Sequence, residues 1–229
     1  MKKYIEKLHF ITHDLAHSSH IEQVQVACEA GAKWIQYRCL SKADDELLAD
    51  INLIAEICDD WGATLIVTNH IHFKGKADIQ GFHIEDMNAD FIALRKQIGE
   101  EFTLGGSANT IEGLIKLANE GADYAGFGPF NTTFTKPNDY PFVSLDEYAK
   151  AIEQLKSVNI DLPILAVGGV TLADVPSLMI TGIFGIAASS AINQAEIMRG
   201  QVPICTYPKW LPFLGDRLGS FYADVRSDA

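Results

Sequence analysis

The stretch Leu117–Pro129 reads LANEGADYAGFGP and joins the end of a helical pattern to an apolar run through a glycine. Gly121 stands where a helix can end on a residue of positive φ, and the apolar run from Tyr124 is typical of a strand buried on both faces. The same layout recurs in ACEAGAKWIQYRC (27–39), ICDDWGATLIVTN (57–69) and LMITGIFGIAASS (178–190). The chain therefore repeats a helix–glycine–strand unit.

Outward from these copies, the apolar runs predict eight strands separated mostly by helices. The strands are expected at His9–Thr12, Trp34–Cys39, Thr64–Asn69, Gly81–Ile84, Thr103–Ser107, Tyr124–Pro129, Ile164–Gly168 and Gly185–Ser189. Helical patterns cover Asp44–Asp60, Phe91–Ile98, Ile111–Asn119 and Leu145–Ser157, whereas 69–81 has room for one helical turn at most. This alternation predicts an α/β fold, a (β/α)8 TIM barrel, although a doubly wound open sheet would share the pattern.

Length and composition favour a single domain. The 229 residues, 48% hydrophobic and 21% charged, can bury a full core, and no stretch resembles a linker. We expect residues 1–195 to form the barrel. The repeat stops before TYPKWLPFLGDRL, so residues 196–229 are expected to form a C-terminal extension that packs on the barrel or on a neighbouring subunit.

Charge and cysteine usage narrow the class of protein. The net charge of −12 argues against nucleic acid as a partner, so any anionic ligand must be held by local features. The four cysteines are widely spaced without a CxxC pair, which argues against a disulfide framework or a zinc site and favours a reducing compartment. Neither a signal peptide nor a membrane-spanning apolar run is evident, and we expect a cytoplasmic protein.

In such barrels the chemistry lies where the strands end. At the second strand, Gln36 and Arg38 share one face, and a buried Arg calls for an anion, either a ligand or an acidic neighbour in the wall. Asn69, His70 and His72 follow the third strand. The His-x-His spacing allows a metal site, but no third ligand is evident from spacing, and loop histidines are commonly solvated.

Acidic and hydroxyl side chains follow the next two strands. Glu85 and Asp86 could hold Mg²⁺ beside a substrate phosphate, or could equally cap the helix that begins near Asp90. Ser107 and Asn109 enter the following helix, where they could cap it or contact an anion.

The last three strands end in small or hydroxyl residues. The stretch GFGPFNTTFTKPN (126–138) supplies Thr133, Thr135 and the single cation Lys136, a set suited to an anionic ligand. Two glycines stand at the end of the seventh strand and two serines at the end of the eighth, where many barrels bind a phosphate on backbone N–H groups. The glycines could also serve only a tight turn. These four residues are Gly168, Gly169, Ser189 and Ser190.

At these residues the chain resembles the thiamine phosphate synthase and thiazole tautomerase superfamily, from about Leu8 to Ile192. IQYR resembles the family's Q-L-R, TNH its N-D, GFHIEDM a shortened G-V-H-L-G-Q-x-D-M, and GGSANT its G-x-S-x-H-T. GADYAGFGPFNTTFTKP resembles G-A-D-Y-x-G-x-G-P-x-x-x-T-x-T-K, LAVGGVT resembles A-I-G-G-I-T, and GIAASSAI resembles G-V-A-V-x-S-A-I. The resemblance implies a TIM barrel that joins hydroxymethylpyrimidine diphosphate to a thiazole phosphate and releases pyrophosphate.

The resemblance also implies roles for individual residues. Arg38, Lys136 and Ser107 would be catalytic, and Asp86 and His70 would bind Mg²⁺. The substrate-binding set would be Gln36, Arg38, Asn69, Ser107, Asn109, Thr133, Thr135, Lys136, Gly168, Gly169, Ser189 and Ser190. Small phosphorylated substrates are the expected partners, without nucleic acid or membrane, and a homo-oligomer is a possible assembly.

Some positions depart from the family pattern. His70 stands where the family has a magnesium-binding Asp, Leu40 stands where it has Lys, and the shortened fourth motif leaves open whether Glu85 or Asp86 meets the metal. These departures keep a second hypothesis alive, a catalytically degenerate paralogue that binds thiazole phosphate without turnover. A thiazole tautomerase fits less well, since Pro129 replaces that branch's His.

Overall fold

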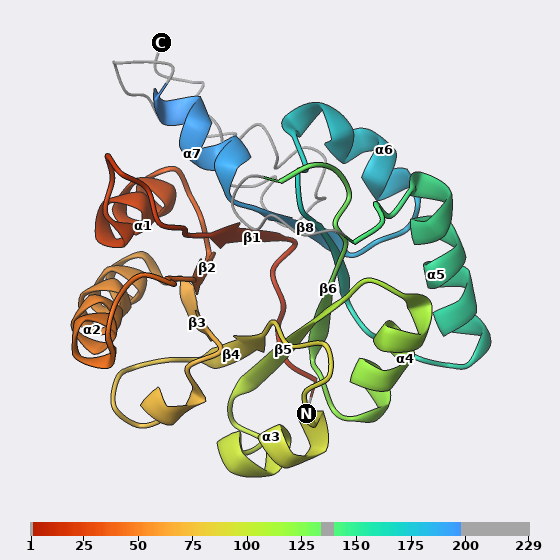
Figure 1. Cartoon of the computed structure of the whole chain (residues 1–229), viewed down its shortest axis with the longest axis horizontal. Coiled ribbons are helices and arrows are strands. Elements are labelled where there is room, and N and C mark those ends of the chain that lie inside the picture. Colours follow the sequence, from red (N-terminus) through yellow and green to blue (C-terminus); the bar gives the residue numbers. More distant parts are fainter. Residues whose placement is uncertain (1, 134–139, 198–229) are drawn as a thin grey trace, which may run out of the picture.

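The computed structural model describes residues 2–133 and 140–197, which form a closed barrel of eight parallel strands (Figure 1). The strands are β1 (Leu8–Ile11), β2 (Trp34–Tyr37), β3 (Thr64–Thr68), β4 (Gly81–Ile84), β5 (Thr103–Ala108), β6 (Tyr124–Phe127), β7 (Ile164–Val167) and β8 (Gly185–Ala188). Each strand pairs with the next, and β8 pairs with β1 through Leu8 and Ile186. This closure confirms the barrel and excludes the open sheet.

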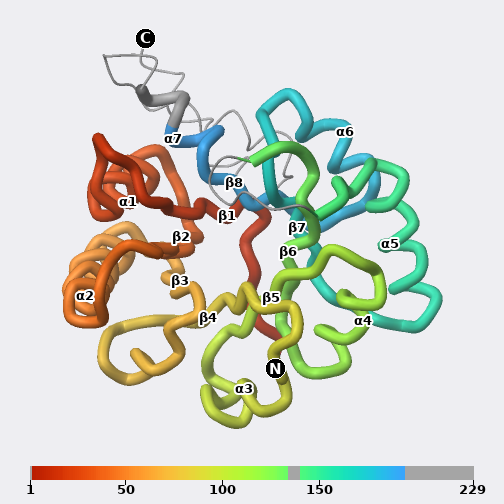
Figure 2. The backbone as a smooth tube through the Cα atoms, in the orientation of Figure 1, coloured from red at the N-terminus to blue at the C-terminus, as the bar shows by residue number. Residues whose placement is uncertain are grey.

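The helices form a ring outside the strands (Figure 2). They are α1 (His20–Glu29), α2 (Asp44–Trp61), α3 (Phe91–Ile98), α4 (Ile111–Asn119), α5 (Leu145–Ser157), α6 (Val175–Ile180) and α7 (Ser190–Ile197). A single 3-10 turn, η1 (Ile71–Phe73), joins β3 to β4, and η2 (Leu172–Asp174) precedes α6. The short third connection is therefore confirmed. The extension predicted for 196–229 lies outside the described residues except for the end of α7.

The repeated glycines end helices as the sequence predicted. Gly31, Gly62, Gly121 and Gly182 all have positive φ, between 60° and 98°. In this left-handed conformation the chain turns from each helix into the following strand. A residue with a Cβ would be strained at these glycine positions.

Several strands end earlier than the sequence predicted. The second was expected to reach Cys39 but ends at Tyr37, because the backbone N–H of Arg38 donates to the Thr12 hydroxyl at 3.0 Å rather than to a strand carbonyl. The sixth was expected to reach Pro129 but ends at Phe127. Arg38 consequently lies on a loop at the rim of the barrel.

The interior of the barrel is closed at its amino-terminal end by packed side chains. His9 stacks on Trp34 with ring centroids 4.3 Å apart and meets the edge of Tyr124 at 5.0 Å. Gly105 makes room for this layer, because a Cβ there would lie 2.1 Å from the Tyr124 ring. A ligand pocket can therefore open only toward the carboxyl ends of the strands.

Candidate active site

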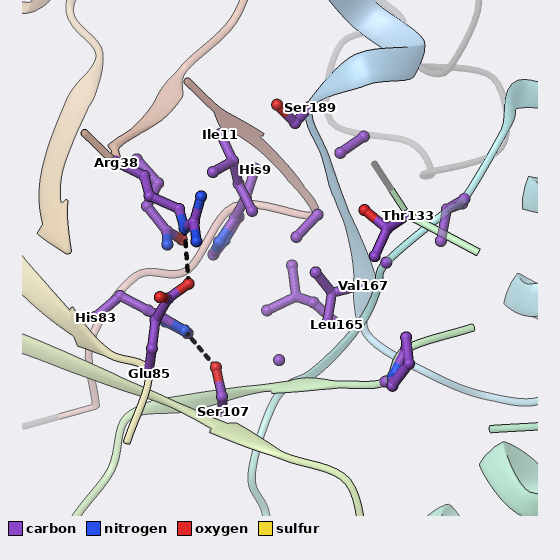
Figure 3. A pocket seen from close by; sticks show the side chains of 18 of the residues that line it. His9, Ile11, Arg38, His83, Glu85, Ser107, Thr133, Leu165, Val167 and Ser189 are labelled. Carbon is purple, nitrogen blue, oxygen red and sulfur yellow. Dashed lines mark hydrogen bonds and ion pairs between the residues drawn. The ribbon is translucent and has the colours of Figure 1, made fainter. Parts of the chain in front are cut away.

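A pocket opens at the carboxyl ends of the strands, where barrel enzymes place their chemistry (Figure 3). Most of the predicted substrate-binding residues line it. They are Gln36, Arg38, Ser107, Asn109, Thr133, Gly168, Gly169, Ser189 and Ser190. The floor between them is apolar, with Ile11, Leu165 and Val167 among the lining side chains. The barrel thus gathers one rim of polar groups from strand ends far apart in the sequence.

Arg38 is the one Lys or Arg among the described lining residues, and it is paired with a carboxylate. Its Nε donates to Glu85 Oε1 at 2.8 Å, and the two side chains are 8% and 16% exposed (Figure 3). The sequence left open whether Arg38 would meet an anionic ligand or an acidic neighbour. The structure pairs it with the acidic neighbour, so an anionic ligand at Arg38 would have to share or displace this contact.

Asn69 supports the site from behind. Its side-chain oxygen accepts the backbone N–H of Glu85 at 2.9 Å, and its own φ of 64° is in the left-handed region. Asn69 does not line the pocket. Its contact instead holds the end of β4, and with it the carboxylate that faces Arg38.

Ser107 is held by a buried chain of hydrogen bonds. Its hydroxyl lies 3.0 Å from His83 Nε2 (Figure 3). His83 Nδ1 in turn lies 3.1 Å from the Tyr124 hydroxyl. Burial raises the pKa of Tyr124, so its phenol stays neutral. A nucleophilic serine needs a base whose imidazolium is stabilised by a carboxylate, whereas this histidine faces a phenol. The geometry favours Ser107 as a fixed hydrogen-bonding group.

Gln36 is similarly anchored. It is 2% exposed, and its side-chain amide donates to the Thr68 hydroxyl at 3.1 Å. A side-chain amide fixed in this way holds its other hydrogen-bonding atoms in one orientation.

The opposite side of the pocket is built from backbone. Gly168 and Gly169 have φ of 86° and 68°, and the carbonyl of Gly168 accepts the backbone N–H of Asn131 at 2.9 Å. A Cβ on Gly169 would lie 2.5 Å from the Thr132 carbonyl oxygen. The glycines therefore let the β6–α5 and β7–η2 loops approach closely, which fits the backbone-lined end of an anion site.

The β8 end adds hydroxyls and a histidine to this side. Ser189 Oγ lies 2.7 Å from His13 Nδ1, and Ser190 is the first residue of α7. Burial, followed by the charges of His20 and Arg38, lowers the pKa of His13, which favours its neutral form. A helix start beside neutral donors is a common setting for a phosphate.

The predicted magnesium ligands do not lie together in one group of metal-type donors. His70 forms such a group with Asp44 and His72, all donor atoms lying within 4.8 Å of one another. Asp86 is exposed, and its Oδ1 accepts the backbone N–H of Asn88 at 2.9 Å. Neither His70 nor Asp86 lines the pocket, whereas Glu85 does. Among the described lining residues, the one carboxylate is thus Glu85, just beyond the end of β4.

Two predicted site residues are not described by the structure, and two residues that line the pocket were not predicted. Thr135 and Lys136 lie outside the described residues. His13 and His83 were not predicted from the sequence, although both line the pocket. His13 lies two residues beyond β1 and could have been found by inspecting that strand end. His83 carries no such signal, because it lies inside a strand and its contact with Ser107 depends on strand pairing.

Comparison with known proteins adds a family relationship. A sequence profile described as "Thiamine monophosphate synthase" matches residues 8–192. The chain is 38% identical over 190 residues to the thiamine-phosphate synthase of Phocaeicola vulgatus, a match that covers 83% of this chain and 91% of that protein. It is 36% identical over 189 residues to the thiamine-phosphate synthase of Bacteroides thetaiotaomicron, covering 82% and 90%.

Solved structures share the fold. Thiamine phosphate pyrophosphorylase from Pyrococcus furiosus aligns with a TM-score of 0.75 at 22% identity, over 91% of this chain and 95% of that one. The corresponding protein from Bacteroides thetaiotaomicron aligns with a TM-score of 0.61 at 16% identity, over 90% and 96%. None of the helices among the described residues is long and apolar enough to cross a bilayer.

Proposed function

The chain belongs to the thiamine monophosphate synthase family, and from this premise we propose that its pocket joins hydroxymethylpyrimidine diphosphate to a thiazole phosphate. The protein is a transferase of thiamine biosynthesis, and the products are thiamine phosphate and pyrophosphate. The observation that carries the proposed site is the convergence of the predicted residues on one pocket, with Arg38 and Ser107 toward one side and Gly168–Gly169 toward the other. Two anion-binding ends over an apolar floor suit two phosphorylated heteroaromatic rings.

The reaction places the chemical demand on the leaving group. The bond between the pyrimidine methylene carbon and the diphosphate oxygen breaks, and pyrophosphate leaves with the electron pair. The thiazole nitrogen lone pair then forms the new bond to that carbon. Such a step needs charge neutralisation and positioning rather than a protein nucleophile. This requirement agrees with the hydrogen-bonded environment of Ser107.

We assign the diphosphate end to Arg38, Lys136 and Ser107, with Gln36 and Asn109 nearby and Asn69 acting through the end of β4. Arg38 and Lys136 would neutralise charge as pyrophosphate departs, and Ser107 would donate a hydrogen bond fixed by His83. Lys136 rests on the sequence motif alone. The diphosphate would share or displace the contact between Arg38 and Glu85.

We assign the thiazole phosphate end to Gly168, Gly169, Ser189 and Ser190, together with Thr133 and Thr135. Backbone N–H groups and neutral hydroxyls would hold this phosphate without a full positive charge. That balance suits a group that must be bound, positioned and then released as part of the product.

Magnesium fits the oxygen donors at the end of β4. Mg²⁺ is typically held by one or two carboxylates, substrate phosphates and water. Glu85 offers a carboxylate at the proposed diphosphate end, and the adjacent Asp86, which is exposed and outside the pocket lining, would have to turn toward the site to add a second. When bound, the ion would offset negative charge on the departing pyrophosphate. His70 remains a predicted ligand; its nitrogen suits Mg²⁺ less well than oxygen does, and its described neighbours are Asp44 and His72.

The binding-only alternative is less favoured, because the relatives that match most of the chain are named as synthases. Homo-oligomer formation and a cytoplasmic location remain predictions.

A direct assay tests the assignment. Purified protein with both substrates and Mg²⁺ should release thiamine phosphate and pyrophosphate in equal amounts, measured by chromatography. Ser107→Ala should lower kcat by about 100-fold, as loss of a positioned donor does. Ser157→Ala is a matched control, since Ser157 lies on α5 and donates to the Gln154 carbonyl. Absence of product from the unaltered protein would reject turnover, whereas an active Ser107→Ala would reject only the role of that serine.

A further inference from the structure

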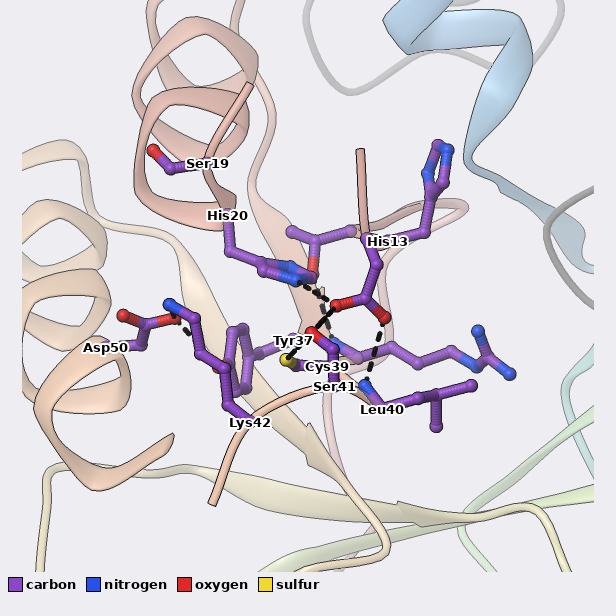
Figure 4. A network of polar contacts seen from close by, with 12 residues as sticks. His13, Ser19, His20, Tyr37, Cys39, Leu40, Ser41, Lys42 and Asp50 are labelled. Carbon is purple, nitrogen blue, oxygen red and sulfur yellow. Dashed lines mark hydrogen bonds and ion pairs between the residues drawn. The ribbon is translucent and has the colours of Figure 1, made fainter. Parts of the chain in front are cut away.

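A second cluster of polar side chains lies on the loops that follow β1 and β2 (Figure 4). Asp14 comes from the loop after β1, His20 is the first residue of α1, and Cys39 lies two residues beyond β2. One ligand atom from each lies within 4.8 Å of the other two. His20 and Cys39 are each 4% exposed, while Asp14 reaches solvent. Three elements thus bring a carboxylate, an imidazole and a thiol to one point.

The His20–Asp14 separation matches a coordination shell better than it matches a hydrogen bond, and the Cys39–Asp14 separation matches both. Asp14 Oδ1 lies 3.4 Å from His20 Nε2 and 3.4 Å from Cys39 Sγ. An N–H donor and a carboxylate normally approach to about 2.7–3.2 Å. Tetrahedral zinc, with bonds of about 2.0 Å to oxygen or nitrogen and about 2.3 Å to sulfur, would instead separate oxygen from nitrogen by about 3.3 Å and oxygen from sulfur by about 3.5 Å.

The surrounding contacts orient the ligand atoms. His20 Nδ1 lies 2.8 Å from the Thr12 hydroxyl, so an Nδ1–H can donate there and leave the Nε2 lone pair facing the cluster. Asp14 Oδ2 accepts the backbone N–H of Leu40 at 3.1 Å, and Ser41 Oγ donates to Asp14 Oδ1. The carboxylate is therefore fixed in place by hydrogen bonds, in the way that neighbouring groups orient the ligands of a metal ion.

We propose that Asp14, His20 and Cys39 form a binding site for a zinc-class divalent ion, separate from the magnesium expected at the diphosphate. Imidazole nitrogen and thiolate sulfur suit Zn²⁺, whereas Mg²⁺ takes oxygen ligands. Binding would convert the Cys39 thiol to a thiolate and release one proton to solvent. The Ser41 hydroxyl or a water would complete the shell, and the exposed side of Asp14 gives the ion its entry path.

The ion would join two loops that border the pocket. Thr12 and His13 precede Asp14, and Arg38 precedes Cys39, and all three line the pocket. A bound ion would therefore link the rim at β1 to the rim at β2 and raise the thermal stability of the protein. This role does not depend on the reaction proposed above.

The exposed group Asp44, His70 and His72 is the alternative location for such an ion. It lacks sulfur, and the side chains of His72 and Asp44 are 45% and 70% exposed. Because the two groups differ in thiolate content, a spectroscopic probe distinguishes them.

Cobalt titration of the full, metal-stripped chain provides the test. Co²⁺ bound to a thiolate gives a charge-transfer absorption in the near ultraviolet, and tetrahedral Co²⁺ gives visible bands. We expect one equivalent of Co²⁺ to produce both signals, Zn²⁺ to displace it, and Zn²⁺ to raise the melting temperature. Cys39→Ser should abolish the charge-transfer band, and Asp14→Asn should weaken Zn²⁺ binding by at least about tenfold.

Two controls complete the design. Cys28→Ala removes a buried thiol outside the cluster and His72→Gln disrupts the exposed group; both variants should keep the band and the zinc affinity. Circular dichroism and melting of the metal-free variants confirm that they fold. A missing charge-transfer band in the unaltered protein, or one that survives Cys39→Ser, would overturn the site. Zinc binding lost in His72→Gln but kept in Asp14→Asn would assign the ion to the exposed group and equally overturn it.

Discussion

Replacing Glu85 by Gln removes one negative charge from the pocket wall and keeps the shape of the side chain. Glu85 Oε1 and Arg38 Nε are 2.8 Å apart, and both side chains are largely shielded from solvent. If Arg38 is the cation that receives the diphosphate, Glu85 competes with every anion that binds there. Glu85→Gln should therefore tighten the binding of inorganic pyrophosphate.

The magnitude follows from the contact itself. A hydrogen bond to a charged group contributes about 1.5–3 kcal/mol, and the residual exposure of Glu85 lowers this to about 1–3 kcal/mol. A coupling of about 1–3 kcal/mol corresponds to about 5- to 150-fold in affinity. The same change should lower the free energy of unfolding by about 1–3 kcal/mol, because Arg38 stays buried beside a neutral partner.

Calorimetric titration of pyrophosphate measures this effect, with a chelator present so that no divalent ion enters the site. Glu101→Gln is the matched control, since it removes the same charge from a side chain that is 65% exposed and paired with Lys74. The Arg38→Gln, Glu85→Gln double variant should lose the gain. If Glu85→Gln binds pyrophosphate no more tightly than Glu101→Gln, Arg38 is not the anion's partner and the assignment of the diphosphate end is wrong.

Three further outcomes are expected. Lys136→Ala should lower kcat by about 100-fold or more by removing a cation from the departing pyrophosphate, and a variant that kept turning over would overturn its assignment. Gly105→Ala should lower the free energy of unfolding by about 1–3 kcal/mol in urea titrations, since its Cβ would meet the Tyr124 ring at 2.1 Å; an unchanged midpoint would contradict this packing. Ser144→Ala should lower the free energy of unfolding by about 1 kcal/mol near pH 7, because it removes the side chain that caps the first turn of α5. Hydrogen bonds from Ser144 lower the pKa of Glu147, so their stabilisation is present above the ordinary pKa of about 4.5 and is lost as the pH falls through the lowered value; a deficit that did not shrink in acid would refute the link.

Local sequence patterns predicted many of the helices and strands. The helices Phe91–Ile98, Ile111–Asn119 and Leu145–Ser157 begin and end where the sequence predicted. Glycines that end helices and apolar runs that form buried strands act over a few neighbouring residues, so a single sequence reveals them. The prediction of strand ends was less accurate, since these ends depend on tertiary partners such as the Thr12 hydroxyl, which accepts the backbone N–H of Arg38.

The candidate site was predictable to the extent that barrel strand ends share one rim. This rule, with the family motifs, pointed to residues from Gln36 to Ser190 that line one pocket. Asn69 and Asp86 show its limit, because position after a strand does not determine which way a side chain points. Asn69 turns back to the backbone of Glu85, and Asp86 accepts the backbone N–H of Asn88.

The sequence by itself determined the repeating unit, the family and the chemical types of residue at the strand ends. Only the tertiary structure decided the pairings of Arg38 with Glu85 and of Ser107 with His83. The widely spaced cysteines argued against a zinc site in the sequence, yet the structure brings Cys39 beside Asp14 and His20. The physical reason is barrel closure. Parallel pairing of consecutive strands brings loops that are distant in the chain to the same edge of the barrel. Contacts of a few ångströms between such loops cannot be predicted from the spacing of residues in the sequence.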